Sequence, residues 1–170
     1  MPGRGIRKLT AMSILSAAAL ILFVVESQIP PVVALPGIKL GLANIVTLIA
    51  VYYLGRKEAG AVLLVRVLLG GIFTGQALAL LYSATGAVLC WAAMSLLSVF
   101  VPVIQMWAVS IVGAIVHNLG QLTAAMLVMR TASVLWYAPA LMIAAILSGA
   151  FTGIAAQFTF KALSRNIREK

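Results

Sequence analysis

The sequence predicts an all-α integral membrane protein built as a six-helix bundle. Of its 170 residues, 64% are hydrophobic, and the mean hydropathy is +1.15, which is more apolar surface than a soluble domain needs. The apolar residues fall into six runs that short connections separate. Each run is expected to form a helix, because an open sheet would leave unpaired backbone groups in lipid.

The six runs are long enough, or nearly so, to cross a hydrocarbon core of about 30 Å. They form one transmembrane domain, 1–170, and lie near residues 9–25, 38–54, 59–81, 87–104, 107–129 and 139–163. The connections are short and are predicted at 26–37, 55–58, 82–86, 105–106 and 130–138. Consecutive helices are therefore expected to lie antiparallel in a tight bundle.

The first two runs carry signals of where a helix starts. The run at 9–25 follows a basic segment, but no small-residue cleavage site comes after it, so we expect a retained helix rather than a signal peptide. The second helix is predicted to begin just after Pro36, which fixes φ and cannot donate a backbone hydrogen bond. Lys39 would stand in its first turn, where a cation opposes the macrodipole. Lys39 could therefore face an anion; the alternative is that it only marks the membrane surface.

The positions of the basic residues indicate how the chain is oriented in the membrane. The chain has 12 Lys and Arg against 3 acids, a net charge of +9. In a six-span topology nine basic residues fall on the side of the two termini, and only Lys39 and Arg130 fall on the other. The positive-inside rule then places both termini in the cytoplasm and the protein in the cytoplasmic membrane. Because these charges flank apolar runs, they do not predict a nucleic-acid partner.

A short motif occurs twice. The segment Gly71-Ile-Phe-Thr-Gly75 of the third run recurs 78 positions later as Gly149-Ala-Phe-Thr-Gly153 in the sixth. Three spans per copy would make the second copy inverted, so the pattern suggests a 3+3 inverted repeat of the kind found in transporters. Chance similarity in a low-complexity sequence is the alternative. Both segments are also GxxxG motifs, which permit close helix packing.

Arg66 is the main candidate for a functional residue. It lies about seven residues into the third run, at a depth of about 10 Å. A guanidinium at that depth requires a carboxylate, a phosphate or several carbonyl groups. The alternative is that its long side chain reaches back to the headgroups.

A second polar cluster interrupts the fifth run. His117 and Gln121 are one helical turn apart and share a face, and Asn118 lies beside them. These side chains could contact a ligand or could join helices by hydrogen bonds. Asn44 is a further ligand candidate. Glu26, at the outer end of the first run, could pair with Lys39 at the mouth of a site.

Several chemistries are excluded by missing residues. The chain has no P-loop motif and no aspartate, so it has neither an aspartate-rich Mg²⁺ diphosphate motif nor a Ser-His-Asp triad. One histidine without Cys or Asp neighbours does not make a metal site. The single cysteine, Cys90, lies in an apolar run and is interpreted as a small hydrophobic residue. No catalytic residue, metal or cofactor is expected.

One bacterial family is similar to this chain over nearly its whole length. The similarity rests on Glu26-Ser-Gln-Ile-Pro, Pro36-Gly-Ile-Lys-Leu-Gly-Leu-Ala-Asn44, Arg66, the first G-x-F-T-G and His117-Asn-Leu-Gly-Gln121. The sequence resembles the family known both as Gx transporters and as heptaprenyl diphosphate synthase component I. That family in turn resembles the substrate-binding S components of energy-coupling factor (ECF) transporters, which have six helices and a site that opens outward. S components meet a coupling subunit through small residues of the first helix, and Ser13-x-x-x-Ala17 matches that pattern loosely.

These observations predict an S-component-like membrane protein that binds a small anionic or amphipathic molecule and helps carry it across the membrane. Its partners would be that substrate, membrane lipid, and ECF-type coupling and ATPase subunits, because the chain has no motor of its own. The alternative is a non-catalytic, membrane-bound accessory subunit of a soluble prenyl synthase. A third interpretation is a scaffold without a ligand. The site residues predicted are Glu26, Lys39, Asn44, Arg66, His117, Asn118 and Gln121.

Overall fold

The computed structural model describes residues 2–29, 41–75 and 77–168 of the chain, and these form an all-helical fold. The α-helices are α1 (Pro2–Ser27), α2 (Asn44–Tyr53), α3 (Arg56–Thr74), α4 (Ala77–Leu97), α5 (Met106–Met129) and α6 (Ala138–Arg168). Two short 3₁₀ helices, η1 (Val103–Gln105) and η2 (Ala132–Tyr137), precede α5 and α6. The all-α class predicted from the sequence is confirmed for this part of the chain.

Four helices of the described chain are long and apolar enough to cross a membrane. They are Gly5–Ser27, Ala77–Leu97, Val103–Met129 and Ala132–Leu163. With 10 residues, α2 is about 15 Å long, which is half of a hydrocarbon core. α3 has 19 residues but carries four charges. Six membrane spans are therefore not confirmed.

The break before α2 comes from the backbone at Gly41. Its φ is +81°, a left-handed conformation that glycine adopts without a steric penalty. The backbone N–H of Asn44 donates to the Gly41 carbonyl at 2.9 Å and closes the turn. A helix that began just after Pro36 would not tolerate this turn. Within the described residues α2 therefore begins at Asn44, six residues later than the predicted run at 38–54.

The turn between α3 and α4 lies earlier than predicted. Gly75 has a φ of +63° and caps α3, with its amide donating to the Gly71 carbonyl. The connection expected at 82–86 is wrong, because 77–97 form one helix. Gly86 lies inside α4, where it allows α5 to approach closely.

The G-x-F-T-G motif has different structures at its two positions. The first copy ends α3, whereas the second lies in the middle of α6, with Gly153 packed against the backbone of Trp107 in α5. An inverted 3+3 repeat is therefore not confirmed. The second copy acts as a helix contact.

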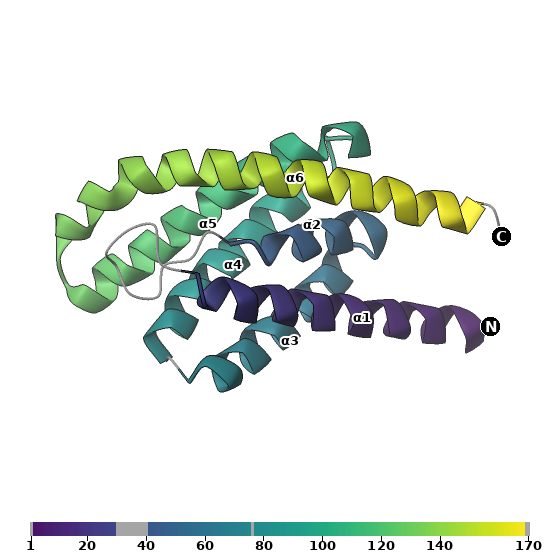
Figure 1. The fold of residues 1–170 in the computed structure, drawn as a ribbon, viewed down its shortest axis with the longest axis horizontal. Helices are drawn as coiled ribbons and strands as arrows, with labels where there is room; N and C mark the ends of the chain where they lie inside the picture. The colour runs from purple at the N-terminus through teal and green to yellow at the C-terminus, as the bar shows by residue number, and fades with distance from the viewer. Residues whose placement is uncertain (1, 30–40, 76, 169–170) are drawn as a thin grey trace.

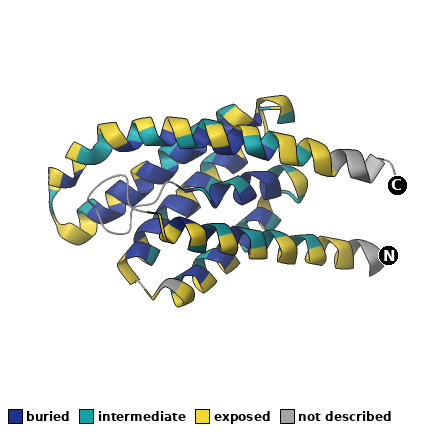
Figure 2. Cartoon of the chain, in the orientation of Figure 1, coloured by how far each residue is buried: buried dark blue, intermediate teal, exposed yellow. Residues whose placement is uncertain are grey.

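α2 is the central element of the bundle and contacts each of the other five α-helices. Seven of its ten residues are buried. Figure 1 shows α1 and α6 running alongside it, with both termini at one end of the molecule and the α5–α6 connection at the other. In Figure 2 the outward faces of α1 and α6 are exposed, whereas the inner helices are mostly buried.

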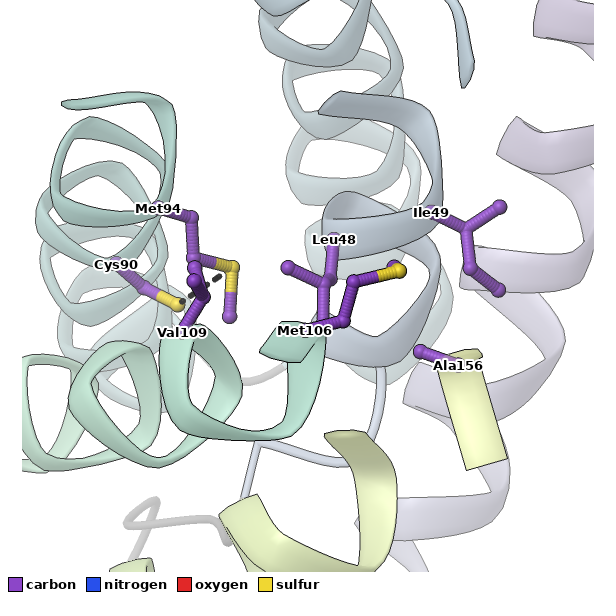
Figure 3. Packing of buried hydrophobic residues seen from close by; sticks show 7 residues of the cluster. All are labelled: Leu48, Ile49, Cys90, Met94, Met106, Val109 and Ala156. Carbon is purple, nitrogen blue, oxygen red and sulfur yellow. Dashed lines mark hydrogen bonds between the residues drawn. The ribbon is translucent and has the colours of Figure 1, made fainter. Parts of the chain in front are cut away.

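Part of the core between the helices is a purely apolar cluster. One cluster joins α2, α4, α5 and α6 and is drawn in Figure 3; it comprises Leu48, Ile49, Cys90, Met94, Met106, Val109 and Ala156. The Cys90 thiol lies 3.7 Å from the Met94 sulfur. Cys90 is thus a core residue, as its apolar run predicts.

Candidate ligand-binding site

The largest fully buried side chain that the structure describes is a cation. Arg66, near the middle of α3, is 1% exposed. Its Nη1 donates to Asn44 Oδ1 at 3.4 Å, which is a long contact. Its Nε and Nη2 have no hydrogen-bond partner among the described residues. The Arg66 side chain is enclosed by the bundle, so it does not extend along the surface toward the lipid headgroups.

Asn44 opens α2 beside this guanidinium. Its Oδ1 accepts the Arg66 contact, and its Nδ2 has no partner within the described chain. The side chain lies against Gly41, since a Cβ built there would stand 2.6 Å from Asn44 Nδ2. The left-handed turn at Gly41 thus brings the start of α2 to the same place as Arg66.

Glu26 closes the cluster from the end of α1. Its carboxylate accepts a hydrogen bond from the Gly41 amide and interacts electrostatically with the Arg66 guanidinium. The sequence predicts this residue at an outer mouth, but the side chain is only 5% exposed. Glu26 therefore holds the turn before α2 in place. Lys39, its predicted partner, lies outside the described residues.

His117 and Gln121 form the α5 side of the cluster. Gln121 Nε2 and His117 Nε2 are 2.7 Å apart, as the i, i+4 spacing predicts. His117 also packs against two glycines: a Cβ at Gly41 would lie 3.1 Å from its Cδ2, and a Cβ at Gly86 would lie 3.0 Å from its Nδ1. That Nδ1 therefore faces the Gly86 backbone.

Five of the predicted site residues therefore meet around Gly41 and Arg66: Glu26, Asn44, Arg66, His117 and Gln121. Asn118 points elsewhere on α5. Its Nδ2 donates to the Leu141 carbonyl of α6 at 2.9 Å, and its Oδ1 has no partner among the described residues. Asn118 thus joins α5 to α6.

Two contacts of the site have no clear signal in the sequence. Gly86 of α4 lets the His117 backbone approach, yet in the sequence it is one small residue in a long apolar run. Phe23 of α1 packs onto Gly70, one turn beyond Arg66, where a Cβ would lie 2.6 Å from the ring. Pairing of these residues depends on how the helices cross, and a single sequence does not contain that information.

A separate apolar groove of about 400 Å³ runs between α1 and α3. Small residues of α1 open it, and aliphatic residues of both helices form its walls. The lining residues are Leu9, Met12, Ser13, Ser16, Ala17, Leu20, Ala61, Val62, Val65 and Leu69. Arg66 is buried inside the bundle and does not line this groove.

The central cluster contains buried hydrogen-bond donors. It offers three buried N–H-bearing atoms without partners in the described chain: Arg66 Nε, Arg66 Nη2 and Asn44 Nδ2. Hydrogen bonds from a guanidinium to a carboxylate or phosphate are about twice as strong as those between neutral groups. Within the described residues no group of three or more His, Cys, Asp or Glu side chains could hold a metal ion.

The sequence comparisons agree with the similarity noted above. A family described as heptaprenyl diphosphate synthase component I matches residues 15–159, which covers all the described cluster residues. No curated protein and no solved structure is similar enough to the chain to count as a match. On this match, the chain belongs to the heptaprenyl diphosphate synthase component I family.

Proposed function

We propose that this protein is a membrane substrate-binding component for a small anionic or amphipathic molecule. The observation that carries the proposal is the burial of Arg66 with two nitrogens that lack a partner among the described residues. A central charge costs about 2.5–3.5 kcal/mol on membrane-insertion scales. Such a cost persists where the residue serves function, and a bound anion would offset it.

The roles of the side chains follow from their atoms. The Arg66 guanidinium binds the negatively charged group of the ligand, and Asn44 Nδ2 supplies a further hydrogen-bond donor. Glu26 holds Gly41, while His117 and Gln121 form the wall on α5. Lys39, although outside the described residues, remains the candidate for the mouth. Asn118 remains a candidate whose Nδ2 would need to release the Leu141 carbonyl before it could donate to a ligand.

The protein would act in the cytoplasmic membrane with both termini in the cytoplasm. Transport would depend on a partner ATPase or an ion gradient, as in the ECF S components that the sequence resembles. Ser13 and Ala17 lie in the groove between α1 and α3, so a coupling subunit that used small residues of the first helix would meet them there.

Mass spectrometry of purified protein tests this function. Protein extracted in mild detergent is expected to retain a small anion, and Arg66→Ala and His117→Ala variants that still fold are expected to lose it. Arg56→Ala serves as a control, because Arg56 is exposed at the start of α3. Equal retention by wild type and both site variants would remove the site assignment.

Membership of the component I family supports a second function. The protein would then be a non-catalytic subunit that holds a polyprenyl diphosphate or anchors a soluble prenyl synthase at the membrane. This function predicts that a prenyl synthase co-purifies with the protein and that the products change in length when the protein is removed. Neither effect is expected of a transport component.

A further inference from the structure

The two partnerless nitrogens of Arg66 are neighbours on one edge of the guanidinium. A guanidinium has five donors in a fixed fork, and its Nε–H and one Nη–H point in parallel from one edge. Nη1, which lies away from that edge, donates to Asn44 Oδ1. The free edge, Nε with Nη2, is therefore the one that binds two oxygen atoms at once.

No acceptor of the described residues makes a hydrogen bond to this edge. The Glu26 carboxylate accepts a hydrogen bond from the backbone N–H of Gly41 and interacts electrostatically with Arg66, but among the described residues it makes no hydrogen bond to Arg66 Nε or Nη2. Asn44 turns its Oδ1 toward Arg66, which leaves its Nδ2 as a third donor in the same cluster. The His117 ring is held by Gln121 through Nε2 and faces Gly86 with Nδ1.

Building on the proposed function, we infer that the ligand is recognised through an oxyanion that presents two oxygens on one atom. A carboxylate, phosphate or phosphonate has this geometry. Arg66 Nε and Nη2 bind the two oxygens side-on, and Asn44 Nδ2 donates to the same group. The charge of Arg66 alone is then insufficient, because a lysine ammonium has no such edge.

A titration with simple oxyanions tests this recognition. Three probes separate the sources of the group: sodium benzoate, inorganic phosphate and dodecyl phosphate, each added to protein in maltoside micelles at constant ionic strength. Binding is followed by thermal stabilisation, and the Arg66 Nε–H resonance is followed by NMR of protein with ¹⁵N-labelled arginine. The Arg66→Lys variant assigns that resonance.

At least one probe is expected to bind and to move the Arg66 Nε–H resonance. Arg66→Lys is expected to lower its affinity by about tenfold or more, which corresponds to one lost charge-assisted hydrogen bond. The matched control Arg56→Lys, an exposed residue of the same helix, should leave affinity unchanged. The melting temperature of each variant without probe shows whether it has folded.

Two results would overturn the inference in distinguishable ways. Saturating stabilisation with an unmoved Nε–H resonance, or equal affinity in Arg66→Lys, would reject side-on recognition and leave the binding function standing. Failure of all three probes to stabilise folded wild-type protein would reject both the inference and the anion-binding function. A response to dodecyl phosphate alone would support the inference for an amphipathic ligand.

Discussion

Arg66 is the residue whose burial works against the stability of the fold. The side chain is enclosed, one nitrogen makes a long contact with Asn44, and the electrostatic interaction with Glu26 offsets part of the cost. Replacing a whole buried ion pair by apolar groups of similar volume is often neutral or stabilising, which shows that buried charge is seldom retained for stability alone. Under the proposed function, a bound anion would supply the partners that Arg66 Nε and Nη2 lack among the described residues.

Gly41 is the residue on which the geometry of the cluster depends. It has a φ of +81°, and a Cβ there would lie 2.6 Å from Asn44 Nδ2 and 3.1 Å from the His117 ring. Gly41→Ala is expected to destabilise the protein by about 1–3 kcal/mol and to abolish ligand retention, because backbone strain adds to a displacement of Asn44. Thermal melting and mass spectrometry measure the two effects.

The control for that substitution is Gly5→Ala in α1. No atom lies within 4 Å of a Cβ at Gly5, and its φ is not in the left-handed region. It should leave retention intact and stabilise the helix by about 0.5–1 kcal/mol. Equal loss of retention in both variants would mean that the turn at Gly41 does not position the site.

At the scale of elements, α1 and α3 are joined near their basic ends by an ion pair. Lys8 Nζ lies 2.5 Å from Glu58 Oε1. The hydrogen bond from Lys8 is the main cause that lowers the pKa of the Glu58 carboxyl below its usual value. Since the folded-state pKa is the lower one, the pair stabilises the fold above the unfolded-state pKa of about 4.3, and this contribution is lost as the pH falls through the folded-state pKa.

Removal of Lys8 should therefore raise the Glu58 pKa. Lys8→Met is expected to return it toward its ordinary value in an NMR titration of ¹³C-labelled carboxyl groups, and added salt should weaken the wild-type shift. Lys57→Met is the control, because Lys57 contributes only the smallest of the Coulomb effects on Glu58. A larger rise in Lys57→Met than in Lys8→Met would contradict the ion pair.

The elements also explain which parts of the fold the sequence predicts. The run 107–129 agrees with α5 to within one residue, and the run 139–163 agrees with the start of α6, which continues beyond it to Arg168. The predicted connection at 82–86 failed because glycine can pack a helix as well as end one. Gly86 packs against α5, whereas Gly75, which belongs to a GxxxG pattern typical of helix packing, ends α3.

Several residues of the candidate site stand out in the sequence, and their role in binding stays a prediction. A buried charge and a polar triplet stand out in an apolar sequence, and Arg66, Asn44, His117 and Gln121 do meet. The contacts that bring these residues together are between different helices. The Glu26–Gly41 hydrogen bond depends on how the chain returns from α1 to α2, which spacing alone does not determine.

At the scale of the whole molecule, the short α2 places the site inside the bundle. Its N-terminal end lies beside Arg66, and it is enclosed by the other helices. Half-helices that end near a binding site are typical of transporters. Exposed apolar side chains cover the outside, including Ile72, Phe151 and Leu127, as expected for a surface that faces lipid.

The position of both termini at one end of the molecule gives a topology prediction. In a Cys90→Ala background, Gly5→Cys and Leu163→Cys are expected to react with a membrane-impermeant maleimide only from the cytoplasmic side. Ser133→Cys, in η2 at the opposite end, should react only from outside. Reaction of positions 5 and 163 from opposite sides would refute the shared orientation.

The central claim is that Arg66 is buried for the sake of a bound anion. The most direct measurement is the melting temperature of wild type and Arg66→Met, each with and without the probe that binds wild type best. We predict that Arg66→Met gains nothing from the probe, whereas wild type gains about 2.7 kcal/mol at 100 times Kd. A large loss of stability in Arg66→Met, together with no stabilisation of wild type by any oxyanion, would show that Arg66 is structural and would contradict the account.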